Sequence, residues 1–365
     1  MKRHLPIVIV FALALAACNA GAGNESTSTS TAAETTTTST TAPAPEAALL
    51  SYTLASGDVF NYQVELGQHI ELTASGDVSL MGGEEVPGDA SIDVTGTATF
   101  THVVSDGPEP GTYEVHITGE FDDVSVTGVI DGESVESEQA PEFASLDPID
   151  VTVVVDEQGN LVQAGPEGSD DPLAGMFGDL GALGGGSPAP GLDPGQFIGP
   201  PFSDEEVAVG DSWTDEVETP GLGADPIVTS ITSTVTGVEE LDGTEVHVIE
   251  TNSTTSLIEF DLAEFFAGMF GAFAPEDASA EEMAELEVML DQLQFLIRVD
   301  GATADSTTWF DAKAGISRKS ETSSAAEITM DLNIPDEETG EMVGFVMEMG
   351  LDQDITFLLI SGPTA

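Results

Sequence analysis

The stretch VGFVMEMGL, residues 343–351, decides the fold class, because its largest apolar side chains fall on every second position. The series is Val343, Phe345, Met347, Met349 and Leu351, and the intervening positions include two glycines and a glutamate. Successive side chains of a β-strand point to opposite faces, so this alternation predicts a strand with one buried face and one wet face. Strands of this kind are typical of antiparallel sheets.

Other segments repeat the same period of two and are separated by turn signals. The apolar members of three further series are Phe60, Tyr62, Val64 and Leu66; Tyr113, Val115 and Ile117; and Ile328, Met330, Leu332 and Ile334. The pairs Asp131-Gly132, Gly159-Asn160 and Asp242-Gly243 lie between extended runs and predict hairpins. Together these signals predict about ten to twelve strands.

Two blocks break the alternation and predict helices. In the Gly- and Pro-rich block 165–203, apolar residues recur at helical spacing over 172–183. The block 261–298 carries one apolar stripe made of Leu262, Phe265, Phe266, Met269, Phe270 and Phe273. A capping box at Ser279 and Glu282 then opens a second helix that we expect to run to Arg298. The predicted fold is mainly β (α+β): a large curved antiparallel sheet or half-barrel closed by apolar helices, with helical insertions at 172–183 and 261–298.

Both blocks contain nearly the same hexapeptide, LAGMFG at 173–178 and FAGMFG at 266–271. The pair is consistent with an ancient duplication or with two apolar flaps over one sheet. A hydrophobic ligand would be lined by Phe265, Phe266, Met269 and Phe270, with Met176 and Phe177 opposite, because Met and Phe side chains suit variable apolar ligands. The alternative is that the same residues fill the core between helix and sheet.

The N-terminus has the pattern of an exported lipoprotein. A basic start at Lys2 and Arg3 precedes an apolar run that ends in Leu15-Ala16-Ala17-Cys18. That ending resembles the lipobox of bacterial lipoproteins, and the resemblance implies a signal peptide over 1–17 and lipid attachment at Cys18. The Ser/Thr-rich segment that follows predicts a disordered tether over 18–47, before a folded domain over 48–362. We therefore expect a lipid-anchored protein on the extracytoplasmic face of a cell membrane or outer membrane, with the membrane as its partner through acyl chains.

Charge narrows the partners further. The chain has 67 acidic and only 6 basic residues, a formal net charge of -61. This balance argues against nucleic-acid binding, which needs clustered Lys and Arg facing phosphates. Such charge suits solubility by self-repulsion, or a salty medium that screens carboxylates. Hydrophobic residues make up 40% of the chain, which predicts a packed core.

No catalytic constellation is recognisable. Cys18 is the single cysteine, and the chain has no nucleophile elbow, P-loop or dinucleotide fingerprint. The histidines beyond the leader are His69, His102, His116 and His247, and none is spaced with another for a metal pair. We therefore expect a non-enzymatic protein with no cofactor and no metal.

The combination of lipobox, tether and long antiparallel sheet resembles lipid-carrier lipoproteins of the LolA-like and LprG-like kind. The stretch TTWFDAKAGISRKSE, residues 307–321, is similar to their strand-turn-strand, and the matching positions are Trp309, Asp311 and Gly315. The resemblance implies a curved half-barrel whose cavity holds acyl chains. The expected function is the binding of a lipid-like ligand, and the alternative is an envelope interaction or structural module without a ligand.

Overall fold

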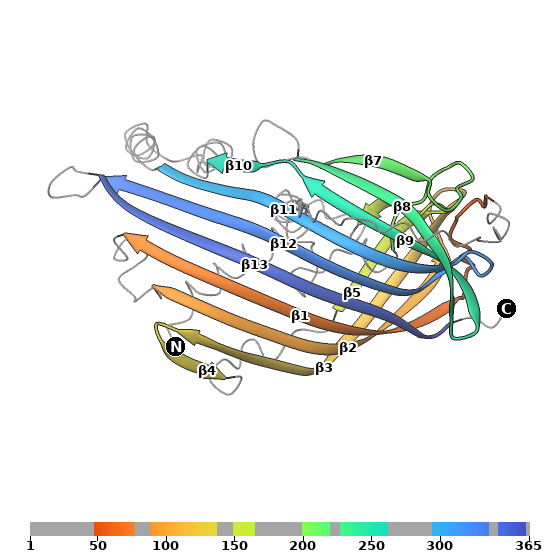
Figure 1. The fold of residues 1–365 in the computed structure, drawn as a ribbon, viewed down its shortest axis with the longest axis horizontal. Helices are drawn as coiled ribbons and strands as arrows, with labels where there is room; N and C mark the ends of the chain where they lie inside the picture. Colours follow the sequence, from red (N-terminus) through yellow and green to blue (C-terminus); the bar gives the residue numbers. More distant parts are fainter. Residues whose placement is uncertain are drawn as a thin grey trace, which may run out of the picture.

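The computed structural model describes residues 47–76, 88–136, 149–164, 199–219, 227–261, 294–335 and 342–362. These residues form one antiparallel sheet of thirteen strands in the order β6-β5-β3-β2-β1-β13-β12-β11-β9-β8-β7, with β4 paired to β3 and β10 paired to β11. The strands are β1 (Val59–Gly76), β2 (Asp89–Asp106), β3 (Thr112–Ile130), β4 (Glu133–Glu136), β5 (Ile149–Asp156), β6 (Leu161–Ala164), β7 (Ser212–Thr219), β8 (Ile227–Leu241), β9 (Thr244–Thr255), β10 (Ile258–Asp261), β11 (Gln294–Asp311), β12 (Ile316–Pro335) and β13 (Met342–Ser361). Figure 1 shows the long strands side by side in a strongly curved sheet. Over the described residues the sheet is not closed, because β6 and β7 are its two edges.

The mainly-β class and the large antiparallel sheet predicted from the alternation are confirmed. In β13, Phe345, Met347, Met349 and Leu351 are all buried, whereas Glu348 between them is exposed. The predicted turns are also present. Asp131 and Gly132 join β3 to β4 with φ of 51° and 81°, the left-handed pair that a tight hairpin requires.

The helical predictions have two different outcomes. The segment 172–183 lies outside the described residues, as does most of 261–298. At its two ends the second prediction is wrong: Asp261 closes β10, and Gln294–Asp311 form β11. In β11, Ile297 is paired with Met330 of β12, so cross-strand burial outweighs the helical spacing that links Ile297 to Leu293. The helices predicted to close the sheet are not shown.

Two short segments that precede β1 and β7 cross the end of the curved sheet. Ala48 and Val207 form an isolated antiparallel bridge that joins them. The Tyr52 N–H donates to the carbonyl of Glu157, in the β5–β6 turn, at 2.8 Å. The next residue, Thr53, donates its N–H to Gly315 in the β11–β12 turn at 3.0 Å. Backbone hydrogen bonds therefore tie both segments to turns that are far away in sequence.

The two segments end in the same turn, which reveals an internal repeat. In A-S-G-D, residues 55–58, the Ala55 N–H donates to the Asp58 carboxylate and the Asp58 N–H returns to the Ala55 carbonyl, both at 2.9 Å. In A-V-G-D, residues 208–211, the equivalent bonds join Ala208 and Asp211 at 2.8 and 3.0 Å. Each turn also forms the same pair of backbone hydrogen bonds with a neighbouring strand, the first turn with Val104 of β2 and the second with Val235 of β8. The two halves of the sheet thus begin alike.

Candidate functional site: the inward face of the sheet

One face of the two central strands is uncharged from end to end. The inward positions of β1 are Phe60, Tyr62, Val64, Leu66, Gln68, Ile70, Leu72 and Ala74. Those of the adjacent strand β13 are Phe345, Met347, Met349, Leu351, Gln353, Ile355, Phe357 and Leu359. The opposite face of the same strands carries the acidic side chains, among them Glu65, Glu71, Glu348, Asp352 and Asp354. Alternation thus separates a wet acidic outer face from an apolar inner face.

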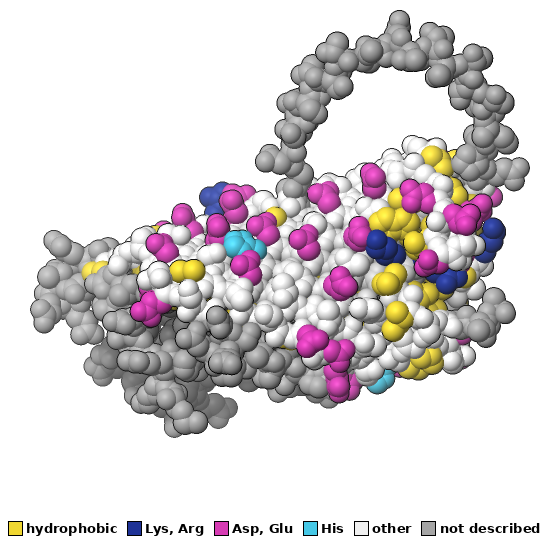
Figure 2. Space-filling view, turned by 60° about the horizontal axis from the view of Figure 1, so that its bottom comes forward, with side chains coloured by type: hydrophobic (Ala, Val, Ile, Leu, Met, Phe, Trp, Pro, Cys, Tyr) yellow, Lys and Arg dark blue, Asp and Glu magenta, His cyan; other side chains and the backbone are white. Residues whose placement is uncertain are grey.

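Charge and apolar side chains are distributed unevenly over the outside of the molecule. Figure 2 shows acidic side chains scattered over the visible surface, with hydrophobic side chains gathered toward one end. Among the described residues, three of the four basic side chains are Lys313, Arg318 and Lys319, around the β11–β12 turn. Each is paired with a carboxylate, so they add little free positive charge to that end.

The inner face carries two separate hydrophobic clusters. The first, which we call the end cluster, is rich in aromatic residues, and its members include Tyr52, Phe60, Tyr62, Phe100, Phe202, Phe310 and Phe357. The second, the trough cluster, lies further along the same strands and consists of Ile70, Leu72, Ile92, Val94, Val126, Ile297, Val299, Ala302, Ala326, Ile328, Met330, Phe345, Met347, Met349 and Leu351. The two clusters differ in the described residues that pack against them.

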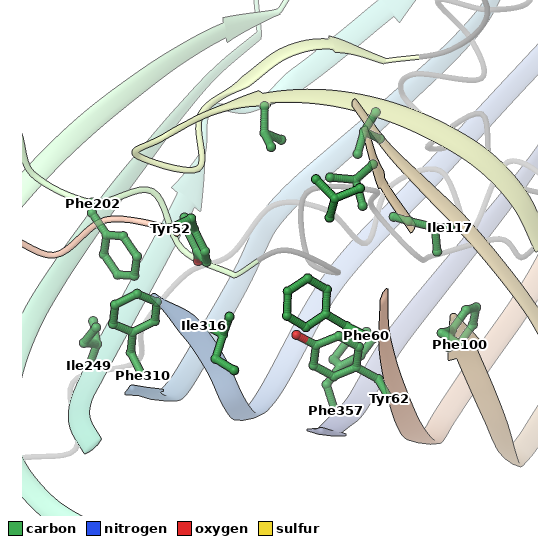
Figure 3. Close-up of a cluster of buried hydrophobic side chains, with 14 of the residues drawn as sticks. Tyr52, Phe60, Tyr62, Phe100, Ile117, Phe202, Ile249, Phe310, Ile316 and Phe357 are labelled. Atoms are coloured by element: carbon green, nitrogen blue, oxygen red, sulfur yellow. The ribbon is translucent and has the colours of Figure 1, made fainter. Parts of the chain in front are cut away.

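The end cluster is a packed protein core. Phe202, from the segment before β7, lies 4.4 Å from the ring of Phe310 and 4.8 Å from that of Tyr52, centroid to centroid. Val153 and Val155 of β5 join the cluster from the other side of the curled sheet. Figure 3 shows the labelled side chains pointing toward one interior space. A cavity of about 20 Å³ lined in part by Tyr52, Tyr62 and His102 has room for one water molecule and for no larger ligand.

The trough cluster is built differently, because its described members all come from the sheet itself. They lie on six consecutive strands of the sheet, in the order β3, β2, β1, β13, β12 and β11. Three of the members are the methionines Met330, Met347 and Met349. The members are buried, none of them more than 8% exposed. The uncharged, Met-rich composition of this face suits an irregular apolar ligand.

Polar side chains mark the boundary between the clusters. Gln353 of β13 is paired directly with Gln68 of β1 on one side and with Ser324 of β12 on the other. Gln353 is only 3% exposed, and neither its Nε2 nor its Oε1 atom has a hydrogen-bond partner within the described part of the protein. The Nε2 atom of Gln68 is likewise enclosed and without a partner there. Buried amide groups in this state are rare in native proteins and call for an explanation.

Some hydroxyl side chains along the inner face lie within hydrogen-bonding distance of one another. Ser233 and Thr251 lie 2.9 Å apart, and Thr308 and Ser320 lie 3.3 Å apart, measured between their hydroxyl oxygens. These pairs sit on neighbouring strands in register, as the sheet geometry requires. The two glutamines differ, because the enclosed amide atoms form no such bond although Gln68 and Gln353 are paired with each other across the ladder.

The ionisable groups near the end cluster have structural roles. The Asp311 carboxylate is buried and accepts hydrogen bonds from Arg318 Nη2 at 2.7 Å and from the backbone N–H groups of Lys313 and Ala314 at 3.1 and 3.0 Å. Burial acts to raise the pKa of Asp311, but these hydrogen bonds outweigh it and hold that pKa below its usual value. Burial also raises the pKa values of Tyr52 and Tyr62 and lowers that of His102 to about 3, so all three stay neutral near pH 7.

The other histidines lie on strands, as their positions in alternating stretches predict. His69 Nδ1 is 2.8 Å from a carboxylate oxygen of Asp93, and His116 Nε2 is 2.7 Å from one of Asp150. The pKa of His69 is raised, chiefly by the hydrogen bond to Asp93. Among the described residues, no group of three or more His, Cys, Asp or Glu side chains is arranged to hold a metal ion. No helix of those residues is long and apolar enough to span a membrane.

Most of the site residues predicted from the sequence fall outside the described ranges. They are Cys18, Met176, Phe177, Phe265, Phe266, Met269 and Phe270. The three positions that carry the family resemblance, Trp309, Asp311 and Gly315, are described and belong to the β11–β12 hairpin, next to the end cluster. Sequence reasoning missed Gln68 and Gln353. Their signal was present, because each interrupts an otherwise apolar alternating series between two aliphatic residues.

Comparisons with known proteins add no functional assignment. Neither a protein-family model nor a curated protein matches the chain. DynF from the dynemicin biosynthesis pathway of Micromonospora chersina is 8% identical over 88% of this chain and 92% of its own, with a TM-score of 0.16. OpdQ of Pseudomonas aeruginosa is 8% identical over 83% of this chain and 99% of its own, also with a TM-score of 0.16. OccK2 (OpdF) of the same species, solved in complex with glucuronate, is 7% identical over 82% and 97%, with a TM-score of 0.16. Likenesses at this level carry no argument about this protein.

Proposed function

We propose that this protein is a membrane-anchored extracytoplasmic lipoprotein that holds a hydrophobic, lipid-like ligand against the inward face of its sheet. The observation that carries the proposal is the trough cluster, an uncharged apolar surface spread over six long strands. Fixed acidic charge is confined to the other face of β1 and β13, so an acyl chain on the inner face meets no carboxylate along these strands. Burial of such a chain would contribute about 0.8 kcal/mol per methylene.

The contrast between the two clusters favours the trough cluster over the end cluster as the place for a ligand. The end cluster is packed against Val153 and Val155 of β5 and against Tyr52 and Phe202 from the segments before β1 and β7. The trough cluster draws its described members from one sheet surface. Flexible Met side chains there can adapt to chains of different length and unsaturation.

A photoactivatable fatty acyl probe tests the proposal directly. The full-length protein, extracted in mild detergent, would be labelled with a diazirine-bearing acyl lipid, and the modified residues identified by mass spectrometry. We expect labelling at inward residues such as Met347 and Met349, and none at Glu348 between them, because alternation turns Glu348 to the other face. Labelling without preference for the inward positions would sink the proposal.

The lipid anchor needs a separate test because Cys18 lies outside the described residues. Metabolic labelling with an alkyne-bearing palmitate should mark the wild-type protein, and the label should be lost in Cys18→Ser. Equal labelling of both proteins would show that Cys18 is not the acylated residue. Fractionation of the labelled cells would then place the protein in the cell membrane or the outer membrane.

One observation favours the second candidate, an envelope interaction module without a ligand. Four large aliphatic side chains are exposed on adjacent strands of the outer face: Val59 and Val103, which are paired, and Leu358 and Ile360 of β13. Exposed apolar side chains grouped in this way mark interaction surfaces. If this patch is the working surface, Leu358→Asp should abolish co-purification of an envelope partner, while Thr356→Asp, two residues earlier on the same face, should not.

A further inference from the structure

The amides of Gln68 and Gln353 form a polar step in the middle of an apolar surface. They face each other across the β1–β13 ladder, where paired residues have Cβ atoms about 4.5–5.5 Å apart. On the β13 side the step is flanked by Leu351 and Ile355, and on the β1 side by Leu66 and Ile70. The polar groups therefore sit at the junction of the end cluster and the trough cluster.

The two side chains leave a definite set of hydrogen-bonding groups unsatisfied. Two amide NH₂ groups, one on each residue, have no described acceptor, and the Gln353 carbonyl has no described donor. Native proteins rarely enclose such groups without a partner, because an enclosed amide loses its bonds to water. Elsewhere on the inner face polar side chains are satisfied in pairs, Ser233 with Thr251 and Thr308 with Ser320.

We propose that the glutamine pair is the polar subsite for an uncharged glycerolipid, of the chemical class of a 1,2-diacylglycerol. In such a lipid the two ester carbonyls accept hydrogen bonds from the two NH₂ groups, and the free hydroxyl donates to Gln353 Oε1. The acyl chains then lie along the trough cluster. This inference rests on the proposed lipid-binding function and names the ligand class for that site.

The absence of positive charge on this face argues for an uncharged ligand over an anionic one. Along the inward positions of β1 and β13 no Lys or Arg occurs, so a buried phosphate or carboxylate would have no counter-charge there. The described basic residues are engaged elsewhere, since Arg298, Arg318 and Lys319 each form an ion pair with a nearby carboxylate. Amides without charge select hydrogen-bonding esters and hydroxyls.

Native mass spectrometry of the full-length protein released from detergent micelles tests the subsite. The probes are 1-palmitoyl-2-oleoylglycerol, a 1,2-dialkylglycerol of similar chain length that lacks the ester carbonyls, and the phosphatidic acid with the same acyl chains. We expect the diacylglycerol to bind about tenfold more tightly than either comparator, the change produced by one or two hydrogen bonds. Gln353→Met, which keeps the side-chain length, should weaken diacylglycerol binding about tenfold and dialkylglycerol binding only about threefold, because the dialkylglycerol loses its hydroxyl bond alone.

Three controls separate the possible failures. Gln68→Met should act in the same direction as Gln353→Met, and it serves as the second variant if the latter does not fold. Gln63→Met, on the exposed face of β1, should change nothing. Equal affinity for all three probes, or unchanged diacylglycerol binding in both inward variants, overturns the subsite while leaving lipid binding intact; this is also the result expected if a water molecule satisfies the amides. Failure to bind any of the three lipids overturns both the subsite and the proposed function.

Discussion

Gly315, in the β11–β12 turn, lies directly against Thr53, which donates its backbone N–H to the Gly315 carbonyl at 3.0 Å. Gly315 has a φ of 65°, and a Cβ atom at this position would collide with the backbone nitrogen and side chain of Thr53. Both the turn conformation and the close approach therefore require glycine. The contact fixes the segment before β1 across the end of the sheet.

Gly315→Ala should lower the free energy of unfolding by about 2–4 kcal/mol, through left-handed strain and the displaced Thr53 segment. Gly243→Ala is the matched control, since φ is 79° there but a Cβ would meet no atom within 4 Å. We expect the control to cost about 1 kcal/mol. Urea denaturation followed by circular dichroism measures both, and equal losses would show that the Thr53 contact contributes nothing.

Phe310→Ala should be among the most destabilising single changes, because Phe310 is fully buried between Phe202 and Tyr52. Removal of a buried Phe ring costs about 3–5 kcal/mol when the surroundings cannot collapse. Leu358→Ala, on the outer face, is expected to stay within about 0.5 kcal/mol of wild type. Thermal unfolding of the three proteins at one pH gives the comparison. A small effect of Phe310→Ala would mean that the end cluster is not a tightly packed core.

Asp311 should make the fold acid-sensitive below about pH 4. Its folded-state pKa lies below the ordinary 3.8, so it contributes stability that is fully present above that value and is lost as the pH falls through the folded pKa. Asp311→Asn should lower stability at pH 7 and flatten the dependence of stability on pH below the ordinary pKa of 3.8. Asp352→Asn, exposed on β13, is the control. Parallel curves for wild type and Asp311→Asn would contradict the role of the Arg318 contact.

His102 should add a second acid-sensitive step at higher pH. Its pKa is about 3 in the fold and 6.5 ordinarily, so the unfolded chain binds the proton first. The stability associated with the neutral ring is therefore complete above pH 6.5 and declines as the pH falls toward 3. His102→Gln should remove this slope, measured as unfolding free energy across that range.

His69 supplies an internal comparison of opposite sign. Its pKa is raised by Asp93, so its contribution is present below pH 6.5 and is lost as the pH rises through the folded value. His69→Gln should therefore leave the acid slope of His102 untouched. If the His69 variant instead abolishes that slope, the assignment of the step to His102 is wrong.

The strands could be predicted from the local sequence pattern, whereas the partner with which each strand pairs in the sheet could not. Alternation in 343–351 and the Asp131-Gly132 turn depend only on residues close in sequence, and both proved correct. Nothing local indicates that β1 pairs with β13, since that choice depends on the whole chain. The same limit explains the error at 294–298, where Leu293 and Ile297 fit a helix as well as a strand until the partner strand β12 decides.

The candidate site was predicted less well than the fold. The residues proposed to line it, such as Phe265 and Met269, lie outside the described ranges. The family resemblance points to the β11–β12 hairpin and not to the trough cluster. Gln68 and Gln353 look like ordinary exposed polar residues in a sequence, because their common face appears only once β1 and β13 are side by side. A glutamine that replaces an expected aliphatic residue is the one local sign available.

The pairing of β1 with β13 also sets the order in which the molecule can be made. Asn61 of the first long strand is bonded into the same ladder as Ser361, three hundred residues later. The centre of the sheet cannot form until the last strand has been synthesised, so folding is delayed by distant contacts. For the exported lipoprotein proposed above, this delay would keep the chain extended during its passage through a membrane channel.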